Sequence, residues 1–201
     1  MSFLITSTGR TGTKFLSQLM NRSKQCTVKH QPDNRDSIME DKITSIDGFF
    51  NNEIPEWQQK RFNKQFYGEV NGALRYNFAE IKADKKGIIC RDYKDVILSF
   101  ANGRDIRSTM ERLVAKVKDV NLCHNAFYKI LEENPQILLI DFDMMTTSKQ
   151  YLLSVLKFFG IDDVEPDLCK VNSNEKWKYK TFNDLPKDII KLINSMEWVK
   201  Y

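Results

Sequence analysis

The sequence contains no apolar run long enough to cross a membrane, because its longest apolar stretches are only a few residues long. A membrane-spanning helix needs about 20 consecutive apolar residues. The first residues pass from the apolar stretch 3–5 directly into polar ones, so we also expect no signal peptide. These absences predict a protein without a membrane partner.

Cysteine is scarce, and its four positions are far apart: Cys26, Cys90, Cys123 and Cys169. No two of them have the spacing of a zinc site or of a small disulfide scaffold. We therefore expect free thiols, a reducing compartment and the cytoplasm as the location.

An excess of charge is also missing, since the net charge is only +4. That value suits a small anionic ligand and is too weak to indicate nucleic acid.

The chain has 201 residues, enough for one domain with a sizeable core, and no linker divides it. We expect a single domain over residues 1–201. Hydrophobic periodicity predicts short buried strands that alternate with helices. The expected strands are 3–5, 26–30, 88–90 and 137–140, and the expected helices begin near 12, 71, 92, 108, 151 and 184. We read 71–83 as one helix, 85–87 as a turn, and Asp184 as the N-cap of the last helix.

Thr147 to Gln150 form a Thr-x-x-Gln capping box for the helix from 151 to 159, and Gly160 ends that helix.

Continuous apolar strands between helices indicate a parallel sheet covered on both faces. The fold class is therefore α/β, with three layers (α/β/α) and about four to five parallel strands. Ligands of such sheets bind at the carboxyl ends of the strands. Those ends are followed here by the loop 7–14, His30, Arg91 and Asp141.

The stretch Ser-Thr-Gly-Arg-Thr-Gly-Thr-Lys at 7–14 joins the first strand to the first helix. Backbone N–H groups converge at such a turn, and the positive end of the helix dipole favours an anion. Arg10 and Lys14 add two cations. We interpret the loop as a phosphate- or sulfate-binding site, although Gly9 and Gly12 could simply permit a tight turn. A second anion site is predicted at Arg91, with Ser99 about two turns into the following helix.

Together these two stretches resemble the PAPS-dependent sulfotransferases, where PAPS is 3′-phosphoadenosine 5′-phosphosulfate. Residues 8–16 (TGRTGTKFL) resemble the family's 5′-phosphosulfate loop, and residues 91–100 (RDYKDVILSF) resemble its 3′-phosphate motif, Arg-Asp-Pro-x-Asp-Val-x-x-Ser. Residues 140–143 with 158–161 resemble a later strand–helix unit. The likeness touches most of the chain and implies a P-loop-like sulfotransferase fold. Tyr93 departs from the motif's proline, and Arg10 stands where many relatives have lysine.

The resemblance implies an enzyme of the EC 2.8.2 type, which transfers a sulfuryl group from PAPS to a hydroxyl or amine without a metal and releases 3′-phosphoadenosine 5′-phosphate (PAP). The acceptor, a small molecule or a glycan, is not readable from the sequence; residues 33–55 and the aromatic residues of 57–67 could shape its pocket. The donor-binding residues it implies are Gly9, Arg10, Thr11, Gly12, Thr13, Lys14, Phe15, Arg91, Ser99 and Trp177. Arg10 or Lys14 would stabilise the bridging oxygen of the leaving phosphate, and the permanent charge of arginine favours an electrostatic role.

The acceptor also needs a general base, and the sequence leaves two candidates open. His30 follows a strand end and titrates near neutral pH. Glu69 is the second candidate, with Asp33 a distant third; Gln31 cannot act as a base. Two rival functions are a P-loop nucleotide kinase or hydrolase and an inactive nucleotide-binding relative. An apolar strand that ends in Asp, at residues 137–141, favours the kinase or hydrolase. Against it, Phe15 stands where such an enzyme has a magnesium-binding hydroxyl.

Overall fold

The computed structural model describes residues 1–30, 66–72, 75, 78–103, 109–168 and 177–199. The chain divides into two compact units. The first unit is formed by Met1–Cys90 with Gln136–Cys169, and the second by Arg91–Pro135 with Lys170–Tyr201. The expectation of a single domain stays a prediction.

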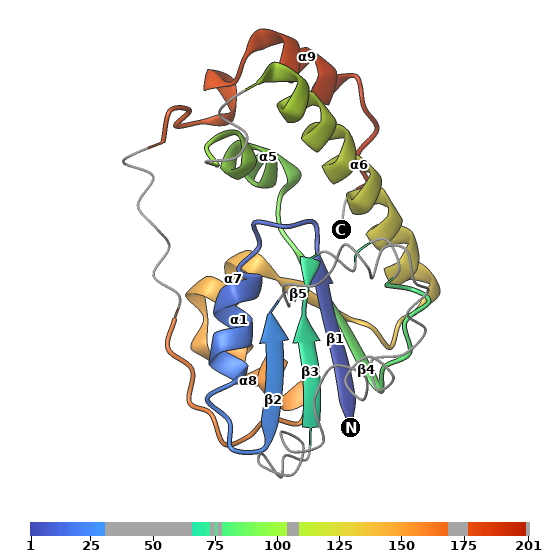
Figure 1. Ribbon diagram of the computed structural model, residues 1–201, viewed down its shortest axis with the longest axis vertical. Coiled ribbons are helices and arrows are strands. Elements are labelled where there is room, and N and C mark those ends of the chain that lie inside the picture. The colour runs from blue at the N-terminus through green and yellow to red at the C-terminus, as the bar shows by residue number, and fades with distance from the viewer. Residues whose placement is uncertain (31–65, 73–74, 76–77, 104–108, 169–176, 200–201) are drawn as a thin grey trace. The chain divides into compact units, whose positions relative to one another are not determined.

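The first unit is built on a five-stranded sheet (Figure 1). Its strands are β1 (Ser2–Ser7), β2 (Cys26–His30), β3 (Phe66–Val70), β4 (Lys85–Cys90) and β5 (Leu138–Asp141). The spatial order is β2-β3-β1-β4-β5, and every neighbouring pair is parallel. This confirms the predicted α/β class with a parallel sheet flanked by helices. The first unit also contains α1 (Thr13–Met20), α7 (Phe142–Thr147) and α8 (Lys149–Phe158).

The central strand β1 is buried along its whole length. Successive side chains of a strand point to opposite faces. Phe3 and Ile5 pack in one core with residues of α1 and α8, among them Leu16 and Leu156. Leu4 and Thr6 therefore face the other side of the sheet, and both are fully buried too. The predicted strand at 3–5 and the helix starting near Gly12 are both confirmed, as is the strand at 26–30.

Strand β3 was not predicted, because glycine is uncommon inside strands and Gly68 is the middle residue of this one. In the structure Gly68 lies opposite Phe3 in the β1–β3 ladder. A Cβ atom on Gly68 would be 2.0 Å from the Phe3 ring, so only glycine lets this ring cover the strand. The predicted helix over 71–83 is also wrong: residues 78–84 form turns and a bridge, and no α-helix is found in the described part of 71–84.

The bounds of one strand and two helices also differ from the predictions. The expected turn at 85–87 is the first half of β4. Thr147 does not cap α8; it is the last residue of the unpredicted helix α7, and the N-cap of α8 is Ser148, whose hydroxyl accepts a hydrogen bond from the Tyr151 N–H. Asp184 belongs to a separate 3₁₀ helix, η3 (Phe182–Asp184), so the last helix α9 (Lys187–Asn194) begins after Pro186.

The second unit is helical and has its own core. Besides η3 and α9 it contains α5 (Tyr93–Ala101) and α6 (Met110–Glu133). Both were predicted, and Asp92 is the N-cap of α5 as expected, since its carboxylate accepts a hydrogen bond from the Lys94 N–H at 2.8 Å. Buried residues of this core come from all three long helices: Val96, Ile97, Leu98, Ala101, Leu113, Val117, Val120, Ile189 and Ile193. No helix within the described ranges combines the length and apolarity that crossing a bilayer requires.

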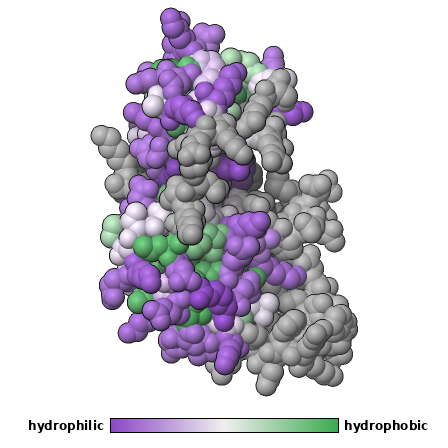
Figure 2. All heavy atoms as spheres, turned by 90° about the vertical axis from the view of Figure 1, so that its left-hand side faces the viewer, coloured by the Kyte–Doolittle hydropathy of each residue, from purple (hydrophilic) through white to green (hydrophobic). Residues whose placement is uncertain are grey.

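The surface of the first unit carries some apolar side chains. Met144 of α7 and Leu153 of α8 are both exposed. Figure 2 shows hydrophobic residues gathered on the side where α1, α7 and α8 lie in Figure 1, with hydrophilic residues around them. Apolar area of this kind is ordinary on folded proteins and by itself assigns no binding partner.

Candidate donor-binding and catalytic site

The loop between β1 and α1 has the backbone of an anion site. Gly9, Arg10 and Gly12 have φ angles of 91°, 55° and 75°, all in the left-handed region. Gly12 is the N-cap of α1 and has no side chain with which to cap it. The first N–H groups of the helix are therefore available to a ligand, at the positive end of the helix dipole. Arg10 and Lys14 are exposed beside them.

A side chain at Gly12 would be both strained, because φ is 75°, and closely packed. A Cβ atom there would lie 3.1 Å from Met145 Cε and 3.2 Å from Phe142 Cε2, both on α7. The loop is thus held against a helix that the sequence analysis did not identify. Phe142 and Met145 are therefore parts of the site that were missed. The motif of an apolar strand followed by Asp141 gave the only hint, because Asp141 accepts a hydrogen bond from the Met144 N–H and starts α7.

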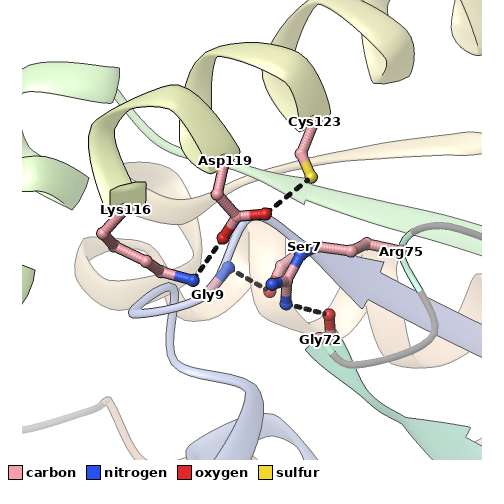
Figure 3. Close-up of polar contacts among 7 residues, drawn as sticks. All are labelled: Ser7, Gly9, Gly72, Arg75, Lys116, Asp119 and Cys123. Atoms are coloured by element: carbon pink, nitrogen blue, oxygen red, sulfur yellow. Dashed lines mark hydrogen bonds and ion pairs between the residues drawn. The ribbon is translucent and has the colours of Figure 1, made fainter. Parts of the chain in front are cut away.

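Two hydroxyl groups in the loop have different environments. Ser7 Oγ accepts a hydrogen bond from the Gly9 N–H at 3.1 Å, which closes the first turn (Figure 3). Thr11 is completely buried, and its Oγ1 makes no hydrogen bond with any group of the residues that the structure describes. A buried polar atom without a partner costs about 1–3 kcal/mol. An anion oxygen bound in the loop is the kind of partner that would remove this cost.

His30 lies at the loop. It is the last residue of β2, and its Nε2 is 3.1 Å from Thr13 Oγ1, at the first position of α1. The structure therefore brings together a residue predicted for donor binding and a residue predicted as the base, although they are 17 positions apart in the chain.

Glu69 lies on the other face of the sheet. His30 is level with Val70 in the β2–β3 ladder, and Val70 packs in the same core as α1. Glu69 precedes Val70, so its side chain points the opposite way. It is almost fully buried, and its Oε1 accepts a hydrogen bond from Asn71 Nδ2 at 2.7 Å. Of the two candidate bases, only His30 lies on the side of the loop and α1.

The second predicted anion site, in the second unit, lies on the first two turns of α5. Arg91 Nη2 is 4.0 Å from Asp95 Oδ2, and the Arg91 side chain is only 17% exposed. Ser99 is half-buried one turn beyond Asp95, and residues four apart share one face of a helix. Arg91, Asp95 and Ser99 therefore follow one another along a single stripe. The sequence analysis missed the role of Asp95 as the ion-pair partner that restrains Arg91.

Trp177 belongs to the same unit and packs partly buried against its core. The segment that follows it is fixed by Asn102, at the end of α5. Asn102 Nδ2 donates to the Tyr179 carbonyl at 2.9 Å, and Asn102 Oδ1 accepts from the Tyr179 N–H at 3.0 Å. Asn102 looked like a simple helix end in the sequence, so this second role was missed.

Other expectations fall on parts of the chain outside the described residues. These are Asp33, the region 33–55, the side chains of the aromatic residues of 57–67, and Cys169. Cys26, Cys90 and Cys123 are free thiols. Across the described residues, no group of three or more His, Cys, Asp or Glu side chains is arranged to hold a metal ion.

No protein-family model matches the chain, and no curated protein sequence matches it. Several solved structures resemble its fold, and two of them are sulfotransferases with the following similarity. A sulfotransferase from Alicyclobacillus acidocaldarius aligns with a TM-score of 0.54 at 15% identity, over 86% of each chain. The sulfotransferase domain from the curacin biosynthetic pathway aligns with a TM-score of 0.52 at 12% identity, over 80% of this chain and 74% of that domain. The chain therefore has a sulfotransferase-like fold.

Proposed function

We propose that the protein is a sulfotransferase that moves a sulfuryl group from PAPS to a hydroxyl or amine of a small-molecule or glycan acceptor and releases PAP. The observation that carries the proposal is the loop 7–14: three left-handed residues and an uncapped helix N-terminus surround Thr11, a buried hydroxyl with no partner. The sulfotransferase-like fold supports it, and so does the position of His30 beside that loop.

Each anionic end of the donor is assigned to its own set of residues. The N–H groups of residues 9–14, the Thr11 and Thr13 hydroxyls, and the cations of Arg10 and Lys14 would bind the 5′-phosphosulfate. Arg91 would bind the 3′-phosphate with two parallel hydrogen bonds, and Ser99 would donate its hydroxyl to the same group. We assign Trp177 to the adenosine part, because aromatic rings stack on bases.

PAPS supplies a sulfuryl group on a phosphate that can leave, and the remaining work falls to this chain's residues. Arg10 and Lys14 provide fixed positive charge where negative charge grows on the bridging oxygen. His30 takes the proton of the acceptor hydroxyl or amine, and Thr13 holds the imidazole beside the loop by its hydrogen bond. A sulfuryl group carries one negative charge fewer than a phosphoryl group, so fixed cations can stabilise its transfer.

Ligand-induced thermal stabilisation tests the donor assignment. PAP in the presence of EDTA should raise the unfolding temperature, because a ligand at about 100 times its Kd stabilises the folded state by about 2.7 kcal/mol. ATP with magnesium should stabilise the protein less. Stronger stabilisation by ATP, abolished by EDTA, would instead identify a nucleotide kinase or hydrolase.

Transfer of radiolabelled sulfate from PAPS to a panel of hydroxyl and amine acceptors tests the reaction itself. Label should move to at least one acceptor class, and Lys14→Met should abolish this transfer. Tight PAP binding without transfer to any acceptor would indicate a nucleotide-binding protein that has lost activity.

A further inference from the structure

We propose that Trp198 is a positioning residue for recognition of the donor's 3′-phosphate: through Tyr93 it holds the first turn of α5 in the conformation that presents Arg91. This inference rests on the proposed function, because it takes Arg91 as the 3′-phosphate ligand. All of the residues involved belong to the second unit.

The contact between Trp198 and α5 is a stacked pair of rings. The Tyr93 and Trp198 rings have centroids 3.9 Å apart and an interplanar angle of 8°. His124 of α6 meets both rings edge-on, with centroid distances of 5.9 Å to Tyr93 and 5.7 Å to Trp198. Aromatic pairs in stacked and edge-on arrangements attract one another beyond the area that they bury. Tyr93, the first residue of α5, is therefore restrained from two sides.

Trp198 can act as a support because its own segment is fixed. Its Nε1 donates to the Ile193 carbonyl at 3.0 Å. Side chains of α6 hold the residues on either side of it. They make four hydrogen bonds, from Asn121 and Asn125 to the Glu197 carbonyl, from the Val199 N–H to Asn125, and between His124 Nε2 and the Val199 carbonyl. The ring stack thus connects α5 to the much longer helix α6.

The stack bears on Arg91 because Arg91 lies only two residues before Tyr93. Asp92, between them, caps the helix, and Arg91 reaches forward to Asp95 in the same turn. In the motif that this stretch resembles, proline stands at the position of Tyr93. Proline fixes φ and preorganises the first turn of a helix. Tyrosine lacks that restraint, and the stack on Trp198 supplies it by another route.

The experiment compares affinities for PAP and for adenosine 5′-monophosphate (AMP), which differ only in the 3′-phosphate, by isothermal titration calorimetry. The quantity of interest is the ratio of the AMP Kd to the PAP Kd. A charge-assisted bidentate contact makes this ratio about ten to one hundred in the unaltered protein. Trp198→Ala should lower the ratio about fivefold or more while the AMP Kd changes less than about twofold, and Trp198→Phe should keep the ratio.

Further variants separate positioning from plain loss of core packing. Leu192→Ala is the matched control. Leu192 packs partly buried against the same core but is not a member of the ring cluster of Tyr93, His124 and Trp198. It should lower thermal stability without changing the ratio.

Tyr93→Leu should lower the ratio as Trp198→Ala does, and the double variant should lower it no further. Tyr93→Pro should restore the ratio in the Trp198→Ala background, because Asp92 already has φ −50° and ψ 128°, the conformation preferred before proline.

The outcomes distinguish the two proposals. A ratio near one in the unaltered protein would contradict the 3′-phosphate assignment, and the inference with it. A high ratio that survives Trp198→Ala, or a parallel loss of AMP and PAP affinity, would contradict the inference alone. If Trp198→Ala does not give a folded protein by circular dichroism, Tyr93→Leu decides in the same way.

Discussion

At the scale of single residues, the two candidate bases differ in what surrounds them. His30 lies beside the loop and shares a hydrogen bond with Thr13, whereas Glu69 is buried on the opposite face of the sheet with Asn71 as its partner. A general base must come within hydrogen-bond reach of the proton that it removes. The face of the sheet on which each side chain lies therefore separates the two candidate bases, between which the sequence could not choose.

His30→Ala should reduce the turnover number about one hundredfold or more, because general base catalysis contributes that much or more. The PAP Kd should stay within about threefold of the original value, since His30 is not assigned to the donor. The measurement is sulfate transfer at saturating PAPS, together with PAP titration calorimetry. Glu69→Gln is the matched comparison, because glutamine keeps the oxygen that accepts from Asn71 and removes the charge. A large loss of turnover in Glu69→Gln and none in His30→Ala would reverse the assignment.

At the scale of elements, the sequence predicted those helices and strands whose signals are local. The helix α5 has an N-cap aspartate and an apolar face, and α8 ends at Gly160, whose φ of 79° suits only glycine well. Strand β4 was partly missed because it begins with two lysines. Lys85 donates to the Phe158 carbonyl, and Lys86 donates to the Phe78 carbonyl at 2.9 Å. These partners lie elsewhere in the chain, so local sequence could not reveal them.

The same distinction applies to the site. The loop 7–14 was found because glycines, hydroxyls and cations occur together in eight residues. The supporting contacts of Phe142, Met145 and Asn102 were not found, because each joins segments that are far apart in sequence. Long-range packing is therefore what the sequence could not supply.

Gly68→Ala tests the packing of β3 on β1. The new methyl group would overlap the fully buried Phe3 ring, and such overpacking should lower the free energy of unfolding by about 3 kcal/mol. Urea denaturation followed by circular dichroism measures the change. Phe3→Leu makes room at the same point, so the double variant should lose less than the sum of the two single losses. Strict additivity would show that the ring moves aside without cost.

Folding stability should depend on pH through His124, the α6 residue whose Nε2 is hydrogen-bonded to the Val199 carbonyl. Burial lowers the pKa of His124 below its ordinary value of 6.5, outweighing the Val199 carbonyl and the Asp92 carboxylate, which raise it. The unfolded chain then binds the proton more readily than the folded one. The contribution of His124 to the free energy of unfolding is therefore present above pH 6.5 and is lost as the pH falls below that value. His124→Gln keeps an N–H donor and does not titrate. Urea midpoints measured from about pH 5 to 8 should fall more steeply in the original protein than in this variant.

At the scale of the whole molecule, the residues proposed to bind the two anionic groups of the donor come from both units. Lys14 belongs to the first unit, and Arg91 is the first residue of the second. The two units are also interleaved along the chain, since each consists of two separate stretches.

Lys14→Met and Arg91→Met should have separable effects on nucleotide binding. Each should weaken PAP binding about tenfold or more, the size of one lost charge-assisted contact. Only Arg91→Met should bring the PAP and AMP affinities close together, because only Arg91 is assigned to the 3′-phosphate. Lys129→Met is the control for loss of one positive charge, since Lys129 is an exposed residue of α6. Equal effects of all three variants would mean that net charge alone attracts the nucleotide.

The interleaving also has a consequence for biosynthesis. Strand β1, the centre of the sheet, is synthesised before the other strands, and its neighbours β3 and β4 begin only at residues 66 and 85. The edge strand β5 emerges after the whole 91–135 stretch, and the last helix of the other unit later still. Neither unit can be completed before the other has begun to be synthesised. The apolar residues of β1 are therefore without their final packing partners for much of the synthesis of the chain, a state in which exposed apolar surface favours aggregation.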